Sequence, residues 1–186
     1  MKIMALRSSF YEKKFQQVEV TSRAQWRTWL SEHQAETDGI WLITFKKHCA
    51  DKYVSYDAVV EEALCFGWID SLPRKLDSDR TRLYISPRRK GSPWSRLNKQ
   101  RVADLLEKGL IMPAGQQKID QAKADGSWTV YDEVEDLIIP ADLATVLEAD
   151  PVAKTHFPAL SDSAKKGILW WIKSAKQTAT RQKRIA

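Results

Sequence analysis

The stretch WIDSLPRKLDSDRTRLYIS, residues 68–86, predicts the centre of the fold. Its two arms, residues 68–76 and 81–86, have the pattern of strands, and the four residues between them, DSDR, have the composition of a turn. Proline cannot donate a hydrogen bond to a sheet ladder, so Pro87 is expected to stop the second strand. We therefore predict an antiparallel hairpin over this stretch.

Residues upstream supply a partner for the hairpin. The run IWLITF, residues 40–45, is apolar on both faces, which is typical of a strand inside a sheet. Phe15, Val18 and Val20 suggest a further short strand. The sequence thus predicts a small sheet in which residues 40–45 form a central strand beside the hairpin.

Residues that start and stop helices divide the rest of the chain. A capping box at Ser22 opens a helix of about twelve residues that should stop near Gly39. Another helix is expected from Ser55 to Gly67, and Pro93 is expected to open one that Gly109 ends. Further helix starts are predicted at Pro113, Pro140, Pro151 and Ser161, and the last of these helices should end in a basic tail over residues 173–184.

Together these elements predict an α+β fold: a small antiparallel sheet with packed helices, followed by a helical C-terminal part. Acidic residues cluster at residues 131–136, which we interpret as a connector. We therefore expect an α+β domain over residues 1–130, carrying the basic, tryptophan-rich segment, and a helical region with a basic tail over residues 131–186.

The composition is that of an ordinary globular protein, with 186 residues of which 43% are apolar and 29% charged. A chain of this size should bury about 70% of its unfolded surface, so a core needs neither metal nor disulfide. The two cysteines form no C-x-x-C pair and the three histidines show no ligand spacing, which predicts no metal site and no cofactor. Cys65 lies in an apolar run and is interpreted as buried, and Cys49, after His48 and two lysines, as a loop residue rather than a nucleophile.

The chain shows no export signal and no membrane span at the sequence level. Within residues 1–10, only residues 3–6 form an unbroken apolar stretch, far shorter than the core of an export signal. The longest later apolar run, residues 168–172, is far too short to cross a bilayer. We therefore expect a cytoplasmic protein whose two cysteines are free thiols.

Positive charge is concentrated in residues 74–101, which we call the basic segment. The whole chain has a formal net charge of +6, whereas this segment has ten basic and two acidic residues and so a net charge of +8. Seven of the ten are arginines, whose planar guanidinium groups suit carboxylates and phosphates. Tyr84 and Trp94 offer rings for stacking. The alternative is a solvated face around the hairpin, with Trp94 as a core residue.

Asp70 is the most informative acid because it follows a glycine, a tryptophan and an isoleucine at the start of a predicted strand. A carboxylate among apolar residues needs partners, which Ser71 or a nearby arginine would supply. Glu61 and Glu62 precede it, so a paired-carboxylate acid/base site is one interpretation and a buried structural ion pair is the favoured one. Nucleotide-binding and nucleophile-elbow motifs are absent from the sequence, and no catalytic residue is assigned.

These observations favour a pocket for an anionic small molecule. A nucleic-acid-binding module and an enzyme acting on a phosphorylated small molecule stay open as alternatives. The pocket is preferred because a surface that only neutralises phosphates would not need an aspartate among its basic residues. The candidate ligand-binding residues are Trp68, Asp70, Ser71, Arg88, Trp94, Ser95, Asn98 and Lys99.

The run EALCFGWIDS, residues 62–71, resembles the signature of the YdeI/OmpD-associated family, also called bacteriocin-protection proteins. The resemblance continues through residues 86–88 and 92–95 to the C-terminal residues 171–185, and so covers nearly the whole chain. It implies protection against bacteriocins or cationic antimicrobial peptides and association with an outer-membrane porin. Members of the family are often described as periplasmic. Because no export signal is visible here, porin association is not expected for this chain.

Overall fold

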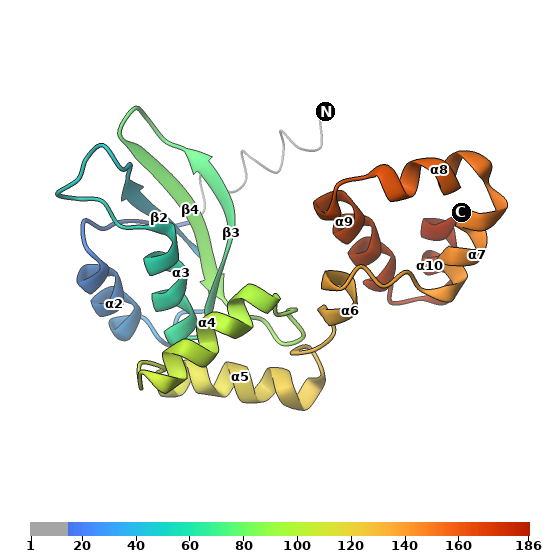
Figure 1. The fold of residues 1–186 in the computed structure, drawn as a ribbon. Helices are drawn as coiled ribbons and strands as arrows, with labels where there is room; N and C mark the ends of the chain where they lie inside the picture. Colours follow the sequence, from blue (N-terminus) through green and yellow to red (C-terminus); the bar gives the residue numbers. More distant parts are fainter. Residues whose placement is uncertain (1–14) are drawn as a thin grey trace. The chain divides into compact units, whose positions relative to one another are not determined.

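A computed structural model describes residues 15–186, so the predicted lack of an export signal in residues 1–10 concerns residues outside the described part. The described chain forms two compact units (Figure 1). The N-terminal unit holds residues 15–92 and 97–125, and the C-terminal unit holds residues 93–96 and 126–186. The division at residues 130 and 131 that the acidic connector suggested stays a prediction.

The N-terminal unit is built on a four-stranded sheet in the order β1 (Gln17–Glu19), β2 (Ile40–Phe45), β4 (Arg80–Pro87) and β3 (Trp68–Lys75). The predicted hairpin is confirmed, because β3 and β4 pair antiparallel. The central place of β2 is confirmed as well, since it lies between β1 and β4. Pro73 is tolerated inside β3 because this strand lies at the sheet edge, where a missing donor costs little.

The sheet is mixed rather than wholly antiparallel. β2 pairs antiparallel with β4, whereas β1 pairs parallel with β2. The reason is the helix α2 (Arg23–Glu32) between β1 and β2, because a crossover through a helix returns the chain in its original direction. The α+β class itself is confirmed.

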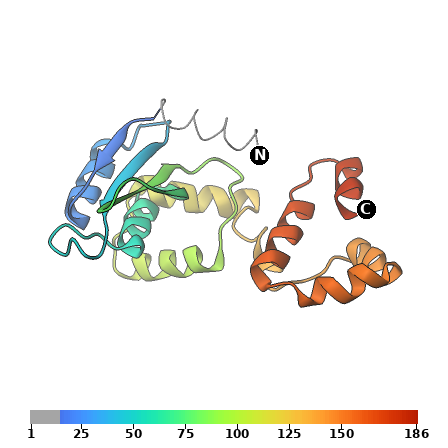
Figure 2. The same ribbon diagram turned by 90° about the horizontal axis from the view of Figure 1, so that it is seen from above.

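Two helices pack side by side against one face of this sheet (Figures 1 and 2). They are α2 and α3 (Tyr56–Cys65), and their predicted caps form: the Ser22 and Ser55 hydroxyls accept hydrogen bonds from backbone N–H groups three residues on. The indole of Trp26 donates a 3.0 Å hydrogen bond to the Val59 carbonyl, which joins the two helices. α2 ends at Glu32, several residues before the predicted stop near Gly39.

Two further helices follow the hairpin, α4 (Arg96–Glu107) and α5 (Pro113–Asp125). The predicted start of α5 at Pro113 and the predicted stop of α4 at Gly109 hold. The predicted start of α4 at Pro93 is wrong by three residues. Trp94 is buried and packs on Trp128 with ring centroids 4.9 Å apart. Residues 93–95 are not helical, and this conformation places the Trp94 side chain in the core before α4 begins.

The C-terminal unit consists of α6 (Asp132–Glu135), α7 (Ala141–Ala149), α8 (Pro151–Ala159), α9 (Asp162–Lys173) and α10 (Thr178–Ile185). The starts predicted at residues 140, 151 and 161 are confirmed to within one residue. The acidic connector contains α6, and the basic tail forms α10 instead of prolonging α9. Within the described residues, no helix has the length and apolar character that crossing a membrane requires. The core of this unit is Val134, Leu143, Leu169 and Ile172.

Candidate functional site

The larger of two described cavities lies on the sheet face that α3 covers and has a volume of about 330 Å³. Leu42 and Leu83 are paired across β2 and β4, and Thr44 and Thr81 are the next pair on the same face. These four residues and Pro73 of β3 form the floor of the cavity. A volume near 330 Å³ is at the small end of the range for ligand sites in proteins.

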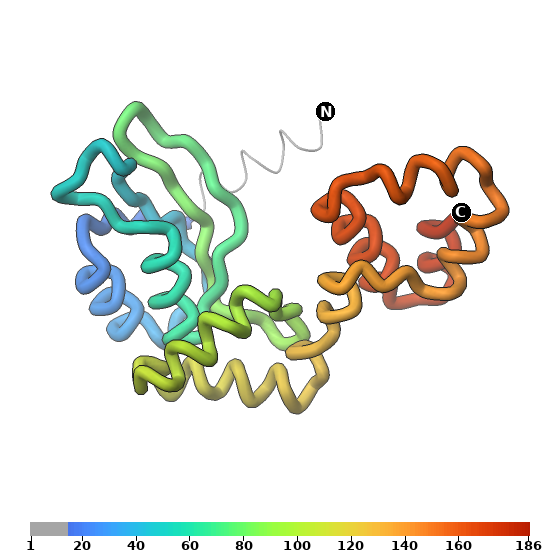
Figure 3. Tube along the Cα trace, viewed as in Figure 1, coloured from blue at the N-terminus to red at the C-terminus, as the bar shows by residue number. Residues whose placement is uncertain are grey.

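The wall of the cavity comes from the loop between β2 and α3 and from the first turns of α3. Lys46, Lys47, Tyr53 and Val54 of the loop line it, as does Tyr56 of α3. Figure 3 shows this loop beside the turn that joins β3 and β4, at one end of the sheet. The site is therefore made from one sheet face, one loop and one helix, all within the N-terminal unit.

The loop is fixed to the β3–β4 turn by hydrogen bonds. The backbone N–H of Lys46 donates to the Asp79 carbonyl at 2.7 Å. The ammonium group of Lys46 donates to the carbonyls of Asp77 and Ser78, each at 2.7 Å. At the other end of the loop, Tyr53 forms a β-bridge with Phe45. The cavity wall is thus held by hydrogen bonds to backbone carbonyls as well as by packing.

The lining carries positive charge and no negative charge. Lys46, Lys47 and Arg82 are among the residues that line the cavity, and none of its described lining residues is acidic. The Arg82 guanidinium lies over the Trp41 ring, 4.8 Å from its centroid, so it belongs to the opposite face of the sheet. Lys47 is exposed and contributes its charge at the cavity itself.

Asp70 lies next to this cavity through its contact with Tyr56. The Tyr56 hydroxyl donates a 2.6 Å hydrogen bond to Asp70 Oδ2. Partial burial of the phenol, together with the neighbouring Asp70 carboxylate, raises the pKa of Tyr56 to about 12. Burial lowers the pKa of Arg88 to about 10, and the charge of Asp70 acts in the opposite direction. Asp70 therefore has the partners that its apolar surroundings require, a phenol and a buried guanidinium.

The eight predicted ligand-binding residues are divided between the two units. Trp68 is buried in the core of the N-terminal unit and Ser71 is exposed on β3. Asn98 and Lys99 lie on α4, where Asn98 accepts a 3.1 Å hydrogen bond from Arg101. Of the eight, only Trp94 and Ser95 belong to the C-terminal unit. None of the eight lines the 330 Å³ cavity, and their role in binding stays a prediction.

Several basic residues of the basic segment are paired with acids. Arg80 contacts Glu19 at 2.6 Å and Asp77 at 2.8 Å. Arg96 contacts Asp136 at 2.5 Å, and Arg101 forms an ion pair with Asp57. The net charge of +8 in the sequence is therefore partly offset by acids in the folded protein.

Glu61 and Glu62 form a structural ion-pair network with two arginines of α2. The buried carboxylate of Glu62 contacts Arg23 Nε at 2.6 Å and Arg27 Nη1 at 2.7 Å. Glu61 contacts Arg23 at 2.8 Å. Each carboxylate is thus oriented toward a cation, which matches the ion-pair interpretation rather than the acid/base one.

A second cavity, of about 280 Å³, lies in the C-terminal unit between α6, α9 and α10. Two of its three charged lining residues are cations that contact acids: Lys173 pairs with Glu133, and Arg181 pairs with Asp142 at 2.6 Å. The Arg181 guanidinium holds the pKa of Asp142 below its ordinary value. Because its charges neutralise one another, this cavity is a weaker candidate for an ionic ligand.

Sequence reasoning missed the loop between β2 and α3. One signal was present: Thr44 interrupts an otherwise apolar, buried strand, and two tyrosines and three lysines follow within twelve residues of it. A polar residue on a buried strand face indicates either a hydrogen-bonded interior or a cavity. Only the strand pairing shows that Thr44 and Thr81 share the same face and lie opposite one another.

Comparisons with known families assign the two parts of the chain to different family models. The model described as "Domain of unknown function (DUF8412)" matches residues 18–118. The model described as "Bacteriocin-protection, YdeI or OmpD-Associated" matches residues 136–186, which hold α7 to α10. The resemblance noted in the sequence is thereby confirmed for the C-terminal part.

Neither a curated protein nor a solved structure matches the chain. The first family match contains β2, β3 and β4 and the cavity, and it spans more than half of the sequence. The protein therefore belongs to the family of the domain of unknown function DUF8412, and its C-terminal segment is similar to the bacteriocin-protection, YdeI or OmpD-associated family.

Proposed function

We propose that the N-terminal unit is a binding module whose cavity takes a small, mainly apolar molecule with one anionic group. The observation that carries this proposal is the 330 Å³ cavity, whose described lining includes cations and apolar side chains but no acid. The apolar floor of leucines and proline would bury the body of the ligand. Lys47 would then contact its carboxylate or phosphate at the mouth.

Two further features support an anion as the charged part of the ligand. The Lys46 ammonium is held by two carbonyls, so its position is fixed before any ligand binds. The hydroxyl of Thr44 lies on the cavity floor and would donate a hydrogen bond to an oxyanion. Preformed donors of this kind reduce the ordering cost of binding.

The pairing of basic residues supports a pocket over a nucleic-acid track. Arg80, Arg96 and Arg101 each contact acids, so these three cations are not available as a continuous row of phosphate contacts. No specific observation favours an enzyme acting on a phosphorylated molecule.

The biological role that we propose is protection against bacteriocins or related stress, exercised in the cytoplasm. The description of the C-terminal family model supports the first part. The two free cysteines support the second, because reduced thiols are the rule in that compartment. Fractionation of cells that express the protein tests the location, and recovery from the periplasm would contradict it. Survival of a sensitive strain with and without the protein, under bacteriocin challenge, tests the role.

The test of the pocket is a thermal-shift screen of aromatic and aliphatic carboxylates, their phosphate counterparts and their uncharged amides. A ligand of the folded state raises the apparent melting temperature, and we expect anions to do so while the amides do not. Lys47→Glu should abolish the shift. Lys75→Glu changes the same charge on an exposed residue of β3 that does not line the cavity, and should leave the shift intact. Equal shifts for anions and amides, or equal losses in both variants, would refute the pocket.

A further inference from the structure

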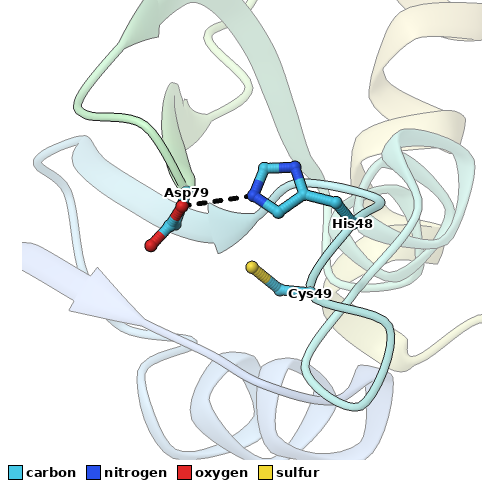
Figure 4. A group of neighbouring side chains, drawn as sticks. All are labelled: His48, Cys49 and Asp79. Atoms are coloured by element: carbon cyan, nitrogen blue, oxygen red, sulfur yellow. Dashed lines mark hydrogen bonds and ion pairs between the residues drawn. The ribbon is translucent and has the colours of Figure 1, made fainter.

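Three side chains with different metal-binding atoms converge beside the cavity wall (Figure 4). They are the imidazole of His48 and the thiol of Cys49, from the loop between β2 and α3, and the carboxylate of Asp79, from the turn between β3 and β4. One ligand atom from each lies within 4.8 Å of the other two. None of these three residues lines the cavity, so the cluster is distinct from the proposed binding pocket.

We propose that His48, Cys49 and Asp79 form a zinc site with three protein ligands and one open position. Nitrogen, thiolate sulfur and carboxylate oxygen are the ligand types that Zn²⁺ accepts, and a mixed set of this kind suits it better than Mg²⁺ or Ca²⁺, which prefer oxygen alone. Three protein ligands leave room for a water molecule in a tetrahedral shell. A shell with an open position is the arrangement found in reactive zinc sites rather than in purely structural ones.

The separations suit this coordination. With Zn–S near 2.3 Å and Zn–N and Zn–O near 2.0–2.2 Å, tetrahedral ligand atoms lie roughly 3.3–3.7 Å apart. His48 Nε2 and Asp79 Oδ1 are 3.2 Å apart, close to that separation. The thiol of Cys49 points into the space beside them in Figure 4, and its sulfur lies within 4.8 Å of both atoms, so a small side-chain movement would complete the shell.

The backbone on both sides of the cluster is positioned without help from these side chains. The Lys46 N–H donates to the carbonyl of Asp79, and the Cys49 N–H donates to the carbonyl of Lys46 at 2.9 Å. The ammonium of Lys46 holds the same turn through two more carbonyls. The loop and the turn thus stay together in the absence of metal, which lowers the ordering cost of binding an ion.

The sequence conceals this site because its ligands do not follow a zinc-binding spacing. His48 and Cys49 are adjacent, and Asp79 lies 31 residues after His48 on another segment. A search for C-x-x-C or for paired histidines therefore finds nothing. The pairing of β2 with β4 is what carries Asp79 to the loop.

The test is metal binding by the full chain, purified in reducing buffer and stripped with a chelator. Calorimetry should show one Zn²⁺ per chain, and Co²⁺ should give a thiolate-to-cobalt charge-transfer band. Cys49→Ser should remove that band, and His48→Ala and Asp79→Asn should each weaken binding by at least about tenfold. His156→Gln removes an exposed histidine of α8 and should change neither readout.

Each result decides the proposal. Absence of Zn²⁺ binding would overturn it, as would a Co²⁺ complex without the thiolate band or binding that survives Cys49→Ser and Asp79→Asn. Circular dichroism of each variant without metal separates lost coordination from lost folding, because these side chains lie in a loop and a turn and should not affect the helical signal. The measurements require no pocket ligand, so failure of the zinc site and failure of the proposed function are distinguishable.

Discussion

The Tyr56 hydroxyl donates a 2.6 Å hydrogen bond to the Asp70 carboxylate, and this bond joins the first turn of α3 to β3, the edge strand of the hairpin. This contact ties a residue that lines the cavity to the acid that the sequence singled out. It also predicts how the N-terminal unit responds to high pH.

Phenol ionisation provides the first prediction. The pKa of Tyr56 is about 12 in the folded chain against an ordinary value of 10.0, so the fold favours the protonated phenol. The stability that this contributes is fully present below pH 10 and is lost as the pH rises toward 12. The difference between the tyrosinate absorbance titrations of the wild type and of Tyr56→Phe should have its midpoint near 12. In an Asp70→Asn background this midpoint should move down, and an unchanged midpoint would show that the carboxylate has no influence.

The two adjacent glutamates of α3 provide the second prediction. Glu62→Gln should lower the free energy of unfolding by about 2 kcal/mol, less than the 3–5 typical of breaking a fully buried pair, because Arg23 and Arg27 can reach solvent. Glu61→Gln removes an ion pair that is partly exposed and should cost less than about 1 kcal/mol. Urea denaturation measures both, and equal costs for the two variants would contradict the structural role of Glu62.

Two glycines within helices should respond in opposite directions to the same substitution. A Cβ at Gly115 of α5 would lie 2.2 Å from the carbonyl oxygen of Cys65, so Gly115→Ala must push α5 away from α3. We expect a loss of about 2 kcal/mol or more. Gly167 of α9 has open space around it, and Gly167→Ala should stabilise by up to about 1 kcal/mol. Each variant is compared with the wild type in the unfolding transition of its own unit.

Nucleic-acid binding should be weak at physiological salt. The exposed basic residues of the hairpin lie at its two ends. Arg74 and Lys75 lie by the turn, and Arg89 and Lys90 lie beyond the far end of β4. Strands of eight residues separate these pairs by roughly 26 Å. Five simultaneous phosphate contacts would give a slope of log K against log salt of about −4.5 on duplex DNA, and we expect a shallower one. Fluorescence anisotropy over a salt series measures it, and tight binding with a steep slope would favour the nucleic-acid alternative.

Local sequence signals predicted most elements of the fold. The hairpin, the interior place of β2 and the helix starts at Ser22, Ser55 and Pro113 depend on turn composition, two-sided apolarity and capping, which act over a few residues. The parallel pairing of β1 was not predicted, although the helix between β1 and β2 requires it. The late start of α4 depends on where Trp94 is buried, which only the folded chain determines.

The candidate site was less accessible to sequence reasoning than the fold. The many arginines of the basic segment predicted a binding site within that segment. Their charge is partly cancelled by acids as distant in sequence as Glu19 and Asp136. The cavity and the His48 cluster both depend on segments that strand pairing brings together. Composition and spacing along one segment cannot show that two distant segments lie side by side in the fold.

The division of the chain into units has a consequence for synthesis on the ribosome. Residues 93–96 belong to the C-terminal unit, yet they are made before α5, which completes the N-terminal unit. At typical rates of translation, the ribosome needs roughly 5–20 s after Trp94 to synthesise the rest of the C-terminal unit. During that interval the nascent protein displays an indole that the finished one buries. In truncated chains that end before Trp128, the Trp94 indole would stay exposed. We expect chaperones and proteases to remove such chains even where the N-terminal unit is intact.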